Sequence, residues 1–383
     1  MTTTIEETNG DFTAVRALGR QIAARADEIE QARRLPRDLV DDLVAAGCFR
    51  SLVPRTYGGS DVGLPAHMRL LRELARADGS VGWTVMIGSS APAILGLLPR
   101  ETLDAIYAAG PDVILAGAFN PTGMATPVDG GYRVTGRWSF ASGCQHADWF
   151  IAHCIVDDGR EPPLRMAVLP ADVVDIVDTW HAAGLCGTGS HDFTVENVFV
   201  PDERTFSVVE PQAALDGPLW RVPELSASTL LLGAVALGIA QAAVDDVADL
   251  ATGKVPTFSA TTLAANPLFQ NQFGQTEARL RAAHAALYTE AEAAWALAVT
   301  GSPFTPEVRA RIRATAILVL QMAVSVVDVA YTAGGGSSLY SSSPLQRRLR
   351  DIRAMTQHFA LKPDTFTLIG AVLTGQEADL SFL

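Results

Sequence analysis

The chain has 383 residues, 48% of them hydrophobic and 19% charged, so it can bury a large interior and is expected to be globular. Its formal net charge of −13, with no basic run, argues against a nucleic-acid surface, because phosphate binding needs clustered Lys and Arg. The four cysteines lack CxxC spacing and no signal-peptide pattern is visible, which favours free thiols in a reducing cytoplasm.

The first segment is predicted to be helical. From Phe12 to about Ala109 the apolar residues recur at helical spacing. Leu39 and Leu43 fall on one face, for example, and Gly47 can end that helix. We therefore expect an N-terminal helical domain over residues 1–110.

Around Val113 the period of the apolar residues changes from helical to alternating. Short β-branched and aromatic segments such as YRVTGRWSFASG, WFIAHCIV and DFTVENVFVP are separated by turn residues. Asp129-Gly130-Gly131 is typical of a β-hairpin turn. The pattern predicts a central domain of antiparallel strands, a barrel or sandwich, over residues 111–210.

After Pro201 the sequence returns to long Ala-rich and Leu-rich helical patterns, which predict a C-terminal helical bundle over residues 211–383. The apolar segment Leu225–Val244 is long enough to span a membrane, but acidic residues flank it and basic anchors are missing. We expect a buried helix and no membrane association. This segment and Ile312–Val329 are so uniformly apolar that a homotetramer, or at least a dimer, is expected through the bundle. The predicted fold is mainly α with a central antiparallel β-domain.

Several familiar chemical signatures are missing from the sequence. It has no P-loop, no GxSxG elbow and no HExxH, and GLCGTGSHD lies between strands instead of opening a helix, as a dinucleotide-binding fingerprint would. His146 and His153 lie in neighbouring β segments, but no carboxylate or thiol pattern completes a metal site. No metal centre is predicted.

Four phrases taken in order resemble the acyl-CoA dehydrogenase superfamily: LVPRTYGGSDVG, GRWSFASGCQHADW, HAAGLCGTGSHDFTVENVFVP and AGGGSSLYSSSPLQRRLRD. The resemblance covers nearly the whole chain. It implies an N-terminal helical domain, a β-domain, a C-terminal bundle, and a flavin held between the β-domain and the bundle with help from a neighbouring subunit.

The same resemblance implies which residues hold the flavin. Phe140, Ala141 and Ser142 would border the ring, with Ser142 facing the edge that carries N5. Gly334 and Gly335 match a Gly-Gly turn beside the cofactor, where backbone N–H groups can approach a phosphate closely. A helix cap before a Ser-rich loop is the alternative interpretation of these two glycines.

The segment PLQRRLRDIRAMTQHFALKP separates two branches of the superfamily. Pro344, Arg347, Arg350 and Asp351 match the Pro-x-x-Arg-x-x-Arg-Asp pattern, whose charged residues are most simply structural ion pairs. In many dehydrogenases a glutamate follows and removes the α-proton of the thioester, but here that position falls at about Phe359. Without that carboxylate, general-base catalysis of dehydrogenation loses its agent.

A histidine after the Arg-Asp pair instead resembles the branch of flavin-dependent monooxygenases. This resemblance implies reduced FMN or FAD as co-substrate, a separate flavin reductase as partner, and oxygenation of a small aromatic, sulfur or amine substrate. His358 would lie near the flavin–oxygen adduct and tune its protonation, since a histidine changes charge near neutral pH. Ser142 would bond the N5 region and Asn120 would orient the substrate. An ordinary, partly exposed helix residue is the alternative interpretation of His358.

Two alternatives to a monooxygenase stay open: an acyl-CoA dehydrogenase and a catalytically silent flavin-binding relative. A phenolic substrate is disfavoured, because Ala91 stands where related phenol hydroxylases carry a histidine.

Overall fold

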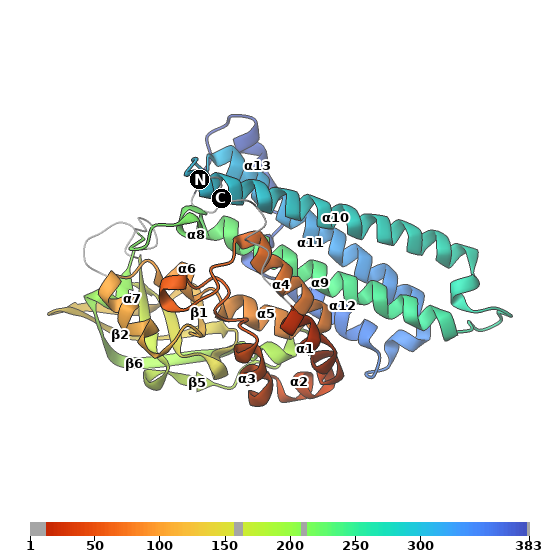
Figure 1. Cartoon of the computed structure of the whole chain (residues 1–383), viewed down its shortest axis with the longest axis horizontal. Coiled ribbons are helices and arrows are strands. Elements are labelled where there is room, and N and C mark those ends of the chain that lie inside the picture. The colour runs from red at the N-terminus through yellow and green to blue at the C-terminus, as the bar shows by residue number, and fades with distance from the viewer. Residues whose placement is uncertain (1–12, 157–163, 208–212, 381–383) are drawn as a thin grey trace.

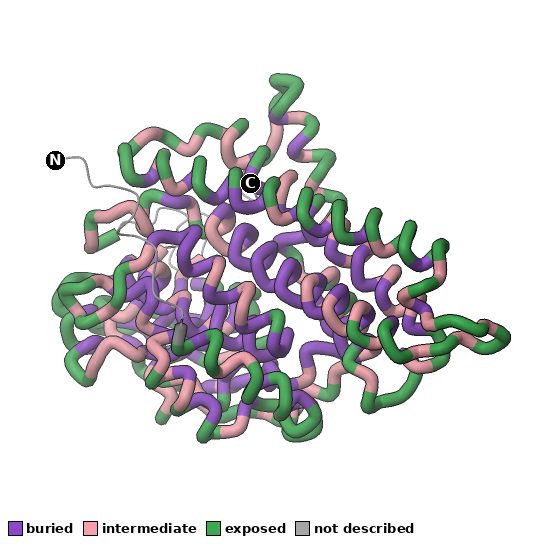
Figure 2. Tube along the Cα trace, turned by 45° about the vertical axis from the view of Figure 1, so that its right-hand side comes forward, coloured by how far each residue is buried: buried purple, intermediate pink, exposed green. Residues whose placement is uncertain are grey.

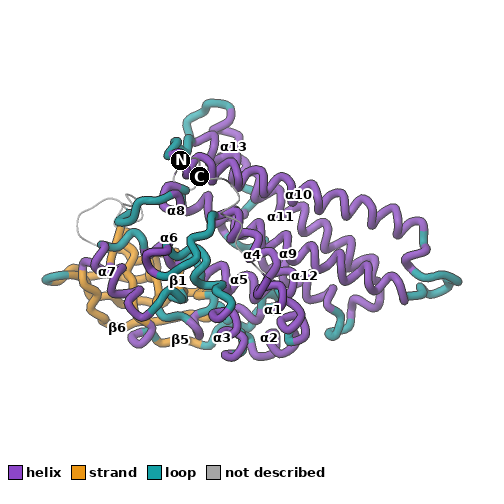
Figure 3. The backbone as a smooth tube through the Cα atoms, viewed as in Figure 1, coloured by secondary structure: helices purple, strands orange, loops and turns teal. Residues whose placement is uncertain are grey.

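The computed structural model describes residues 13–156, 164–207 and 213–380. Helices, then strands, then helices follow one another along the chain, as the sequence predicts (Figure 3). The N-terminal helices are α1 (Thr13–Ala24), α2 (Ala26–Ala32), α3 (Arg37–Ala45), α4 (Leu64–Ala77), α5 (Gly79–Gly88), α6 (Ala91–Leu95) and α7 (Arg100–Ile106). The strands are β1 (Leu115–Val128), β2 (Gly131–Ala141), β3 (Trp149–Ile155), β4 (Leu164–Pro170), β5 (Asp175–Val177), β6 (His191–Pro201) and β7 (Thr205–Phe206). The C-terminal helices are α8 (Pro218–Arg221), α9 (Glu224–Gly253), α10 (Pro267–Thr300), α11 (Pro306–Gly334), α12 (Pro344–Met355) and α13 (Thr365–Leu373).

The strands form a sheet in the order β5-β6-β2-β1-β3-β4-β7. The predicted hairpin joins β1 to β2, and Gly130 takes the left-handed φ of +73° that this turn requires. The expectation of purely antiparallel strands is wrong in one place, because β1 and β3 pair in parallel, with Leu115 opposite Trp149. The first part of the long strand β1 pairs with β3 and its last part with β2, so the sheet is mixed.

Helix α9 forms the centre of the C-terminal bundle. Its sequence is apolar on all sides, so it must be covered all round, and it packs most extensively against α4 and α11. By length and composition, α9 and the segment Pro306–Leu339 could each cross a membrane. In α9, however, 83% of the most apolar 18-residue stretch is buried inside this chain, which confirms the prediction of a buried helix. Figure 2 shows the buried residues in the interior of the bundle. The corresponding value for Pro306–Leu339 is only 44%.

The sheet lies at one end of the molecule and the long helices extend away from it, with the N-terminal helices beside both (Figure 1). Ion pairs join α12 to α2: Arg347 binds Asp27 and Glu30, and Arg350 binds Glu30 at 2.7 Å. The two arginines thus form structural ion pairs, but between two helices of one chain and not within a helix or between subunits as expected.

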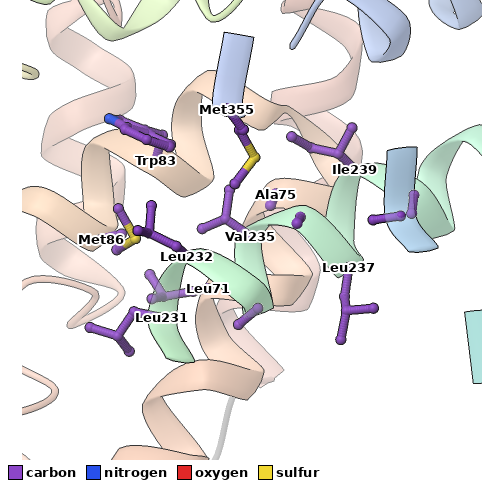
Figure 4. Packing of buried hydrophobic residues seen from close by; sticks show 14 of the residues in the cluster. Leu71, Ala75, Trp83, Met86, Leu231, Leu232, Val235, Leu237, Ile239 and Met355 are labelled. Carbon is purple, nitrogen blue, oxygen red and sulfur yellow. The ribbon is translucent and has the colours of Figure 1, made fainter. Parts of the chain in front are cut away.

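Helix α5 links the N-terminal helices to the bundle. Asp78 caps its N-terminus by accepting hydrogen bonds from the backbone N–H groups of Ser80 and Val81. The helix is buried on nearly every side, and its Trp83 lies close to Met355 of α12, above the apolar residues of α9 (Figure 4). Because α12 ends at Met355, the fold places His358 next to α5.

Candidate active site

Ser142 lies directly after β2 in a buried cluster of hydroxyl groups. Its Oγ accepts a hydrogen bond from Trp83 Nε1 at 3.0 Å and lies 2.7 Å from Ser190 Oγ. Ser190 Oγ in turn lies 2.7 Å from Thr188 Oγ1. The backbone N–H of Gly143 donates to the carbonyl of Thr188 at 2.8 Å, which ties this loop to the end of β2. Ser142 is thus rigidly held and is only 6% exposed.

Phe140 presents an aromatic ring beside this cluster. The pairing of β2 with β6 is irregular between Trp138 and Ala141, and Phe140 there adopts a φ of +70°, which is unusual for a bulky residue. Its side chain is 65% exposed and meets the ring of Trp180 edge-on, with the centroids 6.3 Å apart, whereas Ala141 is buried. Of the three predicted residues, Phe140 therefore presents an apolar ring at the surface, while Ala141 and Ser142 lie buried beside it.

His358 lies in the loop after α12, where its Nδ1 accepts a hydrogen bond from the backbone N–H of Ala360 at 3.3 Å. A neutral imidazole that accepts at Nδ1 carries its proton on Nε2. Burial, together with the charge of Arg313, lowers the pKa of His358 to about 4. The expectation that His358 changes charge near neutral pH is therefore wrong, because the charged form is disfavoured by desolvation and by the neighbouring guanidinium. At neutral pH His358 is a neutral hydrogen-bond donor.

Trp83 brings Ser142 and His358 together. Its Nε1 donates to Ser142, and its ring meets the His358 imidazole edge-on with the centroids 5.6 Å apart. The indole is only 8% exposed. Sequence reasoning did not identify Trp83. The signal that could have found it is a tryptophan in a helix predicted to be buried, because a buried indole N–H needs a hydrogen-bond acceptor.

Glu224 is a titratable residue with a shifted pKa that sequence reasoning missed. It begins α9 and is an exposed residue, although protein atoms around its carboxyl group shield that group from water. Burial raises the pKa of Glu224 to about 7, partly opposed by the positive charge of Arg313. Arg313 is buried in α11, and burial lowers its pKa to about 10. The charge of Arg313 thus acts on both Glu224 and His358.

Two other predicted site regions are not part of this cluster. Asn120 is exposed on β1, and within the described residues no hydrogen bond joins it to Ser142 or His358. Gly334 and Gly335 lie at the opposite end of α11 from Arg313, roughly 30 Å away at 1.5 Å per residue. There the carbonyl of Gly334 accepts a hydrogen bond from Lys254 Nζ, and Gly335 has a φ of +52°.

The described residues contain no group of three or more His, Cys, Asp or Glu side chains that could hold a metal ion. The four cysteines are free, and burial raises the pKa of Cys48, Cys144 and Cys154 to about 12, so these thiols stay protonated.

Comparison with known families identifies the class. The model of the acyl-CoA dehydrogenase N-terminal domain matches residues 11–98, and the model of the acyl-CoA dehydrogenase C-terminal domain matches residues 230–363. The chain belongs to the acyl-CoA dehydrogenase superfamily.

Its relatives place it among the monooxygenases of that superfamily. It is 36% identical to the indole-3-acetate monooxygenase of Pseudomonas putida, over 92% of this chain and 91% of the relative. It is 29% identical to the oxygenase subunit HsaA, a flavin-dependent monooxygenase of Rhodococcus jostii, over 89% of this chain and 91% of that protein. The solved structure of XiaF from a Streptomyces species, in complex with FADH2 and glycerol, superposes with a TM-score of 0.89 at 27% identity and covers 95% of this chain and 94% of that one. The protein is a flavin-dependent monooxygenase.

The residues around Ser142 fit a flavin. An isoalloxazine ring is flat and apolar on its faces and polar along its N5 edge. The exposed ring of Phe140 and the half-buried ring of Trp180 offer aromatic surface beside the hydroxyl group of Ser142. The Ser142 Oγ uses one of its two lone pairs to accept the hydrogen bond from Trp83 Nε1.

Proposed function

We propose that this protein is the oxygenase component of a two-component system, in which a separate reductase supplies reduced FMN or FAD. The observation that carries the proposal is the indole of Trp83, which holds the flavin-facing Ser142 and the neutral donor His358 in one rigid cluster. When bound, the reduced flavin would supply the two electrons that activate O2, so that one oxygen atom goes to the substrate and the other leaves as water.

The side chains around the ring have separate tasks in this proposal. Ser142 fixes the N5 edge, and Phe140 with Trp180 excludes water from one face. His358 donates from Nε2 to the oxygen that is to be transferred, and its low pKa keeps it from acting as an acid that would release hydrogen peroxide at neutral pH. Asn120 stays a candidate for orienting the substrate from β1.

We further propose that the substrate is a small aromatic molecule that carries a carboxylate. The relatives in Pseudomonas putida and Acinetobacter baumannii, at 36% and 35% identity, are named for indole-3-acetate. The buried guanidinium of Arg313 lies close enough to His358 to lower its pKa, so it can attract an anionic group next to the reacting centre.

The assembly and the location of the protein are also proposals. Pro306–Leu339 is strongly apolar, yet only 44% of its apolar window is covered within one chain, and Leu318 of α11 is 48% exposed. A homotetramer built through the bundle would cover this face and would bring the Gly334 turn of one subunit to the cofactor of another. We place the protein in the cytoplasm, where its thiols stay reduced.

Oxygen consumption tests the proposed function. The protein is mixed with FMN or FAD reduced by dithionite or by an unrelated flavin reductase, with indole-3-acetate as the first substrate, and both oxygenated product and hydrogen peroxide are quantified. We expect product to form only when protein, reduced flavin and O2 are all present. Bleaching of oxidised flavin by an acyl-CoA thioester, without product from the aromatic acid, would point to a dehydrogenase instead.

A further inference from the structure

The hydroxyl groups of Ser142, Ser190 and Thr188 form a hydrogen-bonded series, which we call the hydroxyl chain, and the direction of the hydrogen bond is known at both of its ends. At one end Trp83 Nε1 can only donate, and it donates to Ser142 Oγ. At the other end Thr188 Oγ1 lies 2.8 Å from the carbonyl oxygen of Leu185, which can only accept. Between the ends, Ser142, Ser190 and Thr188 are linked at 2.7 Å each.

Counting protons fixes the direction of this chain. If Thr188 donates to the Leu185 carbonyl, its single hydroxyl proton is used, so Ser190 must donate to Thr188 and Ser142 must donate to Ser190. The opposite direction leaves the contact between Thr188 and Leu185 without a proton. Because these hydroxyls are buried, a lost hydrogen bond is costly, and the one-way arrangement that satisfies every link is favoured.

The consequence falls on Ser142. Its own proton points away from the flavin side, toward Ser190, and Trp83 occupies one lone pair, so what Ser142 offers a ligand is its second lone pair. The two redox forms of a flavin differ at this point, because N5 carries a hydrogen in the reduced ring and only a lone pair in the oxidised ring.

We infer that Ser190 and Thr188 are positioning residues that make Ser142 a hydrogen-bond acceptor and so let the site distinguish reduced from oxidised flavin. The inference rests on the proposed function, which places the N5 edge at Ser142. A reduced ring gains a hydrogen bond there, whereas an oxidised ring meets two lone pairs that face each other. In an enzyme that receives reduced flavin from a reductase, this preference favours binding of the reduced flavin and dissociation of the oxidised flavin after the reaction.

Thr188→Val tests the direction of the chain without touching Ser142. Valine has nearly the shape of threonine but has no hydroxyl group, so Ser190 loses the oxygen to which it donates. Ser190 can then donate to Ser142 instead. The proton of Ser142 is thereby free to form a hydrogen bond to an oxidised flavin. In this variant the carbonyl oxygen of Leu185 still accepts hydrogen bonds from Trp180 Nε1 and from the backbone N–H of residue 188, each at 3.1 Å. The substitution therefore does not leave this carbonyl oxygen without a hydrogen bond. Ser190→Ala is a second variant with the same expected effect, and Thr188→Ser is the control that keeps the hydroxyl.

The measurement is the dissociation constant of oxidised FMN or FAD in air and of reduced flavin under anaerobic conditions, by equilibrium titration without substrate. In wild type and Thr188→Ser we expect tighter binding of the reduced form. In Thr188→Val and Ser190→Ala the ratio of oxidised to reduced dissociation constants should fall about tenfold, the worth of one hydrogen bond. This corresponds to a midpoint potential of the bound flavin lower by ~30 mV for a two-electron couple.

The outcomes separate the inference from the proposed function. If the wild-type protein binds reduced flavin and both variants keep the wild-type ratio, the hydroxyl chain does not set the preference and the inference is wrong. If the wild-type protein binds neither form, the proposed function fails and the inference falls with it. If Thr188→Val does not fold, the ratio for Ser190→Ala decides.

Discussion

Replacing Asp351 with asparagine should make the protein more resistant to alkaline conditions. Asp351 is completely enclosed between α12, α5 and the loop that precedes β6. Its Oδ1 accepts a hydrogen bond from the backbone N–H of Leu185 at 2.6 Å, while Oδ2 has no partner among the described residues. An added Cβ at Gly79 would lie 3.1 Å from Oδ2, so this oxygen is packed against the start of α5.

Burial and then the neighbouring Asp78 carboxylate raise the pKa of Asp351 from its ordinary 3.8 to about 7, partly opposed by Arg348 and Arg350. The folded state therefore holds a proton that the unfolded chain has released, and stability falls as pH rises from about 4 to about 7. A displacement of this size corresponds to about 4 kcal/mol. With an unfolding entropy of ~2 cal/mol/K per residue over the whole chain, that is a shift of roughly 5 °C in Tm.

Thermal unfolding at about pH 5 and about pH 8 measures this effect. Asparagine keeps the acceptor for Leu185 and cannot ionise, so the Tm of Asp351→Asn relative to that of wild type should rise by a few degrees between the lower and the higher pH. Asp178→Asn is the control, because the Arg33 guanidinium lowers the pKa of Asp178 to about 2 and its ionisation does not change in this window. A Tm difference between Asp351→Asn and wild type that is the same at both pH values would refute the assigned proton.

Three further predictions concern activity. His358→Ala should raise the ratio of hydrogen peroxide to product by roughly ten-fold or more, the effect of losing a ~1–3 kcal/mol hydrogen bond in a water-poor pocket. In wild type this ratio should not change between about pH 6 and pH 9, because the pKa of His358 is about 4. A strong pH dependence that vanishes in His358→Ala would contradict this prediction. Arg313→Gln should raise KM for indole-3-acetate about ten-fold and leave KM for neutral indole nearly unchanged, and an equal rise for both would show a structural role only. Acyl-CoA thioesters should not reduce a flavin-linked dye, since Phe359 occupies the position of the glutamate that acts as base in the dehydrogenases. Dye reduction that occurs in wild type and is lost in Glu224→Gln would instead identify Glu224 as the base.

The fold could be predicted from the sequence where a local pattern determines it. The change from helical to alternating apolar residues near Val113 marked the strands, the Asp129-Gly130 turn marked the hairpin, and the all-round apolar character of α9 marked the centre of the bundle. The parallel pairing of β1 with β3 was missed, because pairing depends on which strand segments meet in space and leaves no local pattern.

The site was only partly predictable for the same reason. Ser142 and His358 stood in recognisable phrases, but the indole that joins them comes from α5, more than fifty residues before Ser142. The carboxyl group of Glu224 looked like an ordinary residue at a helix start, and only its burial in the folded chain raises its pKa. Burial likewise removes the neutral-pH titration expected of His358, since desolvation is a property of the fold and not of the residue type.

The most direct test of the central claim is the source of the oxygen in the product. The protein is incubated with reduced flavin, indole-3-acetate or another small aromatic acid, and isotopically labelled dioxygen in unlabelled water, and the product is analysed by mass spectrometry. A flavin-dependent monooxygenase places one labelled oxygen atom in the product, and the label disappears when reduced flavin is left out. Product that contains only oxygen from water, or product that forms equally well without reduced flavin, would contradict the account.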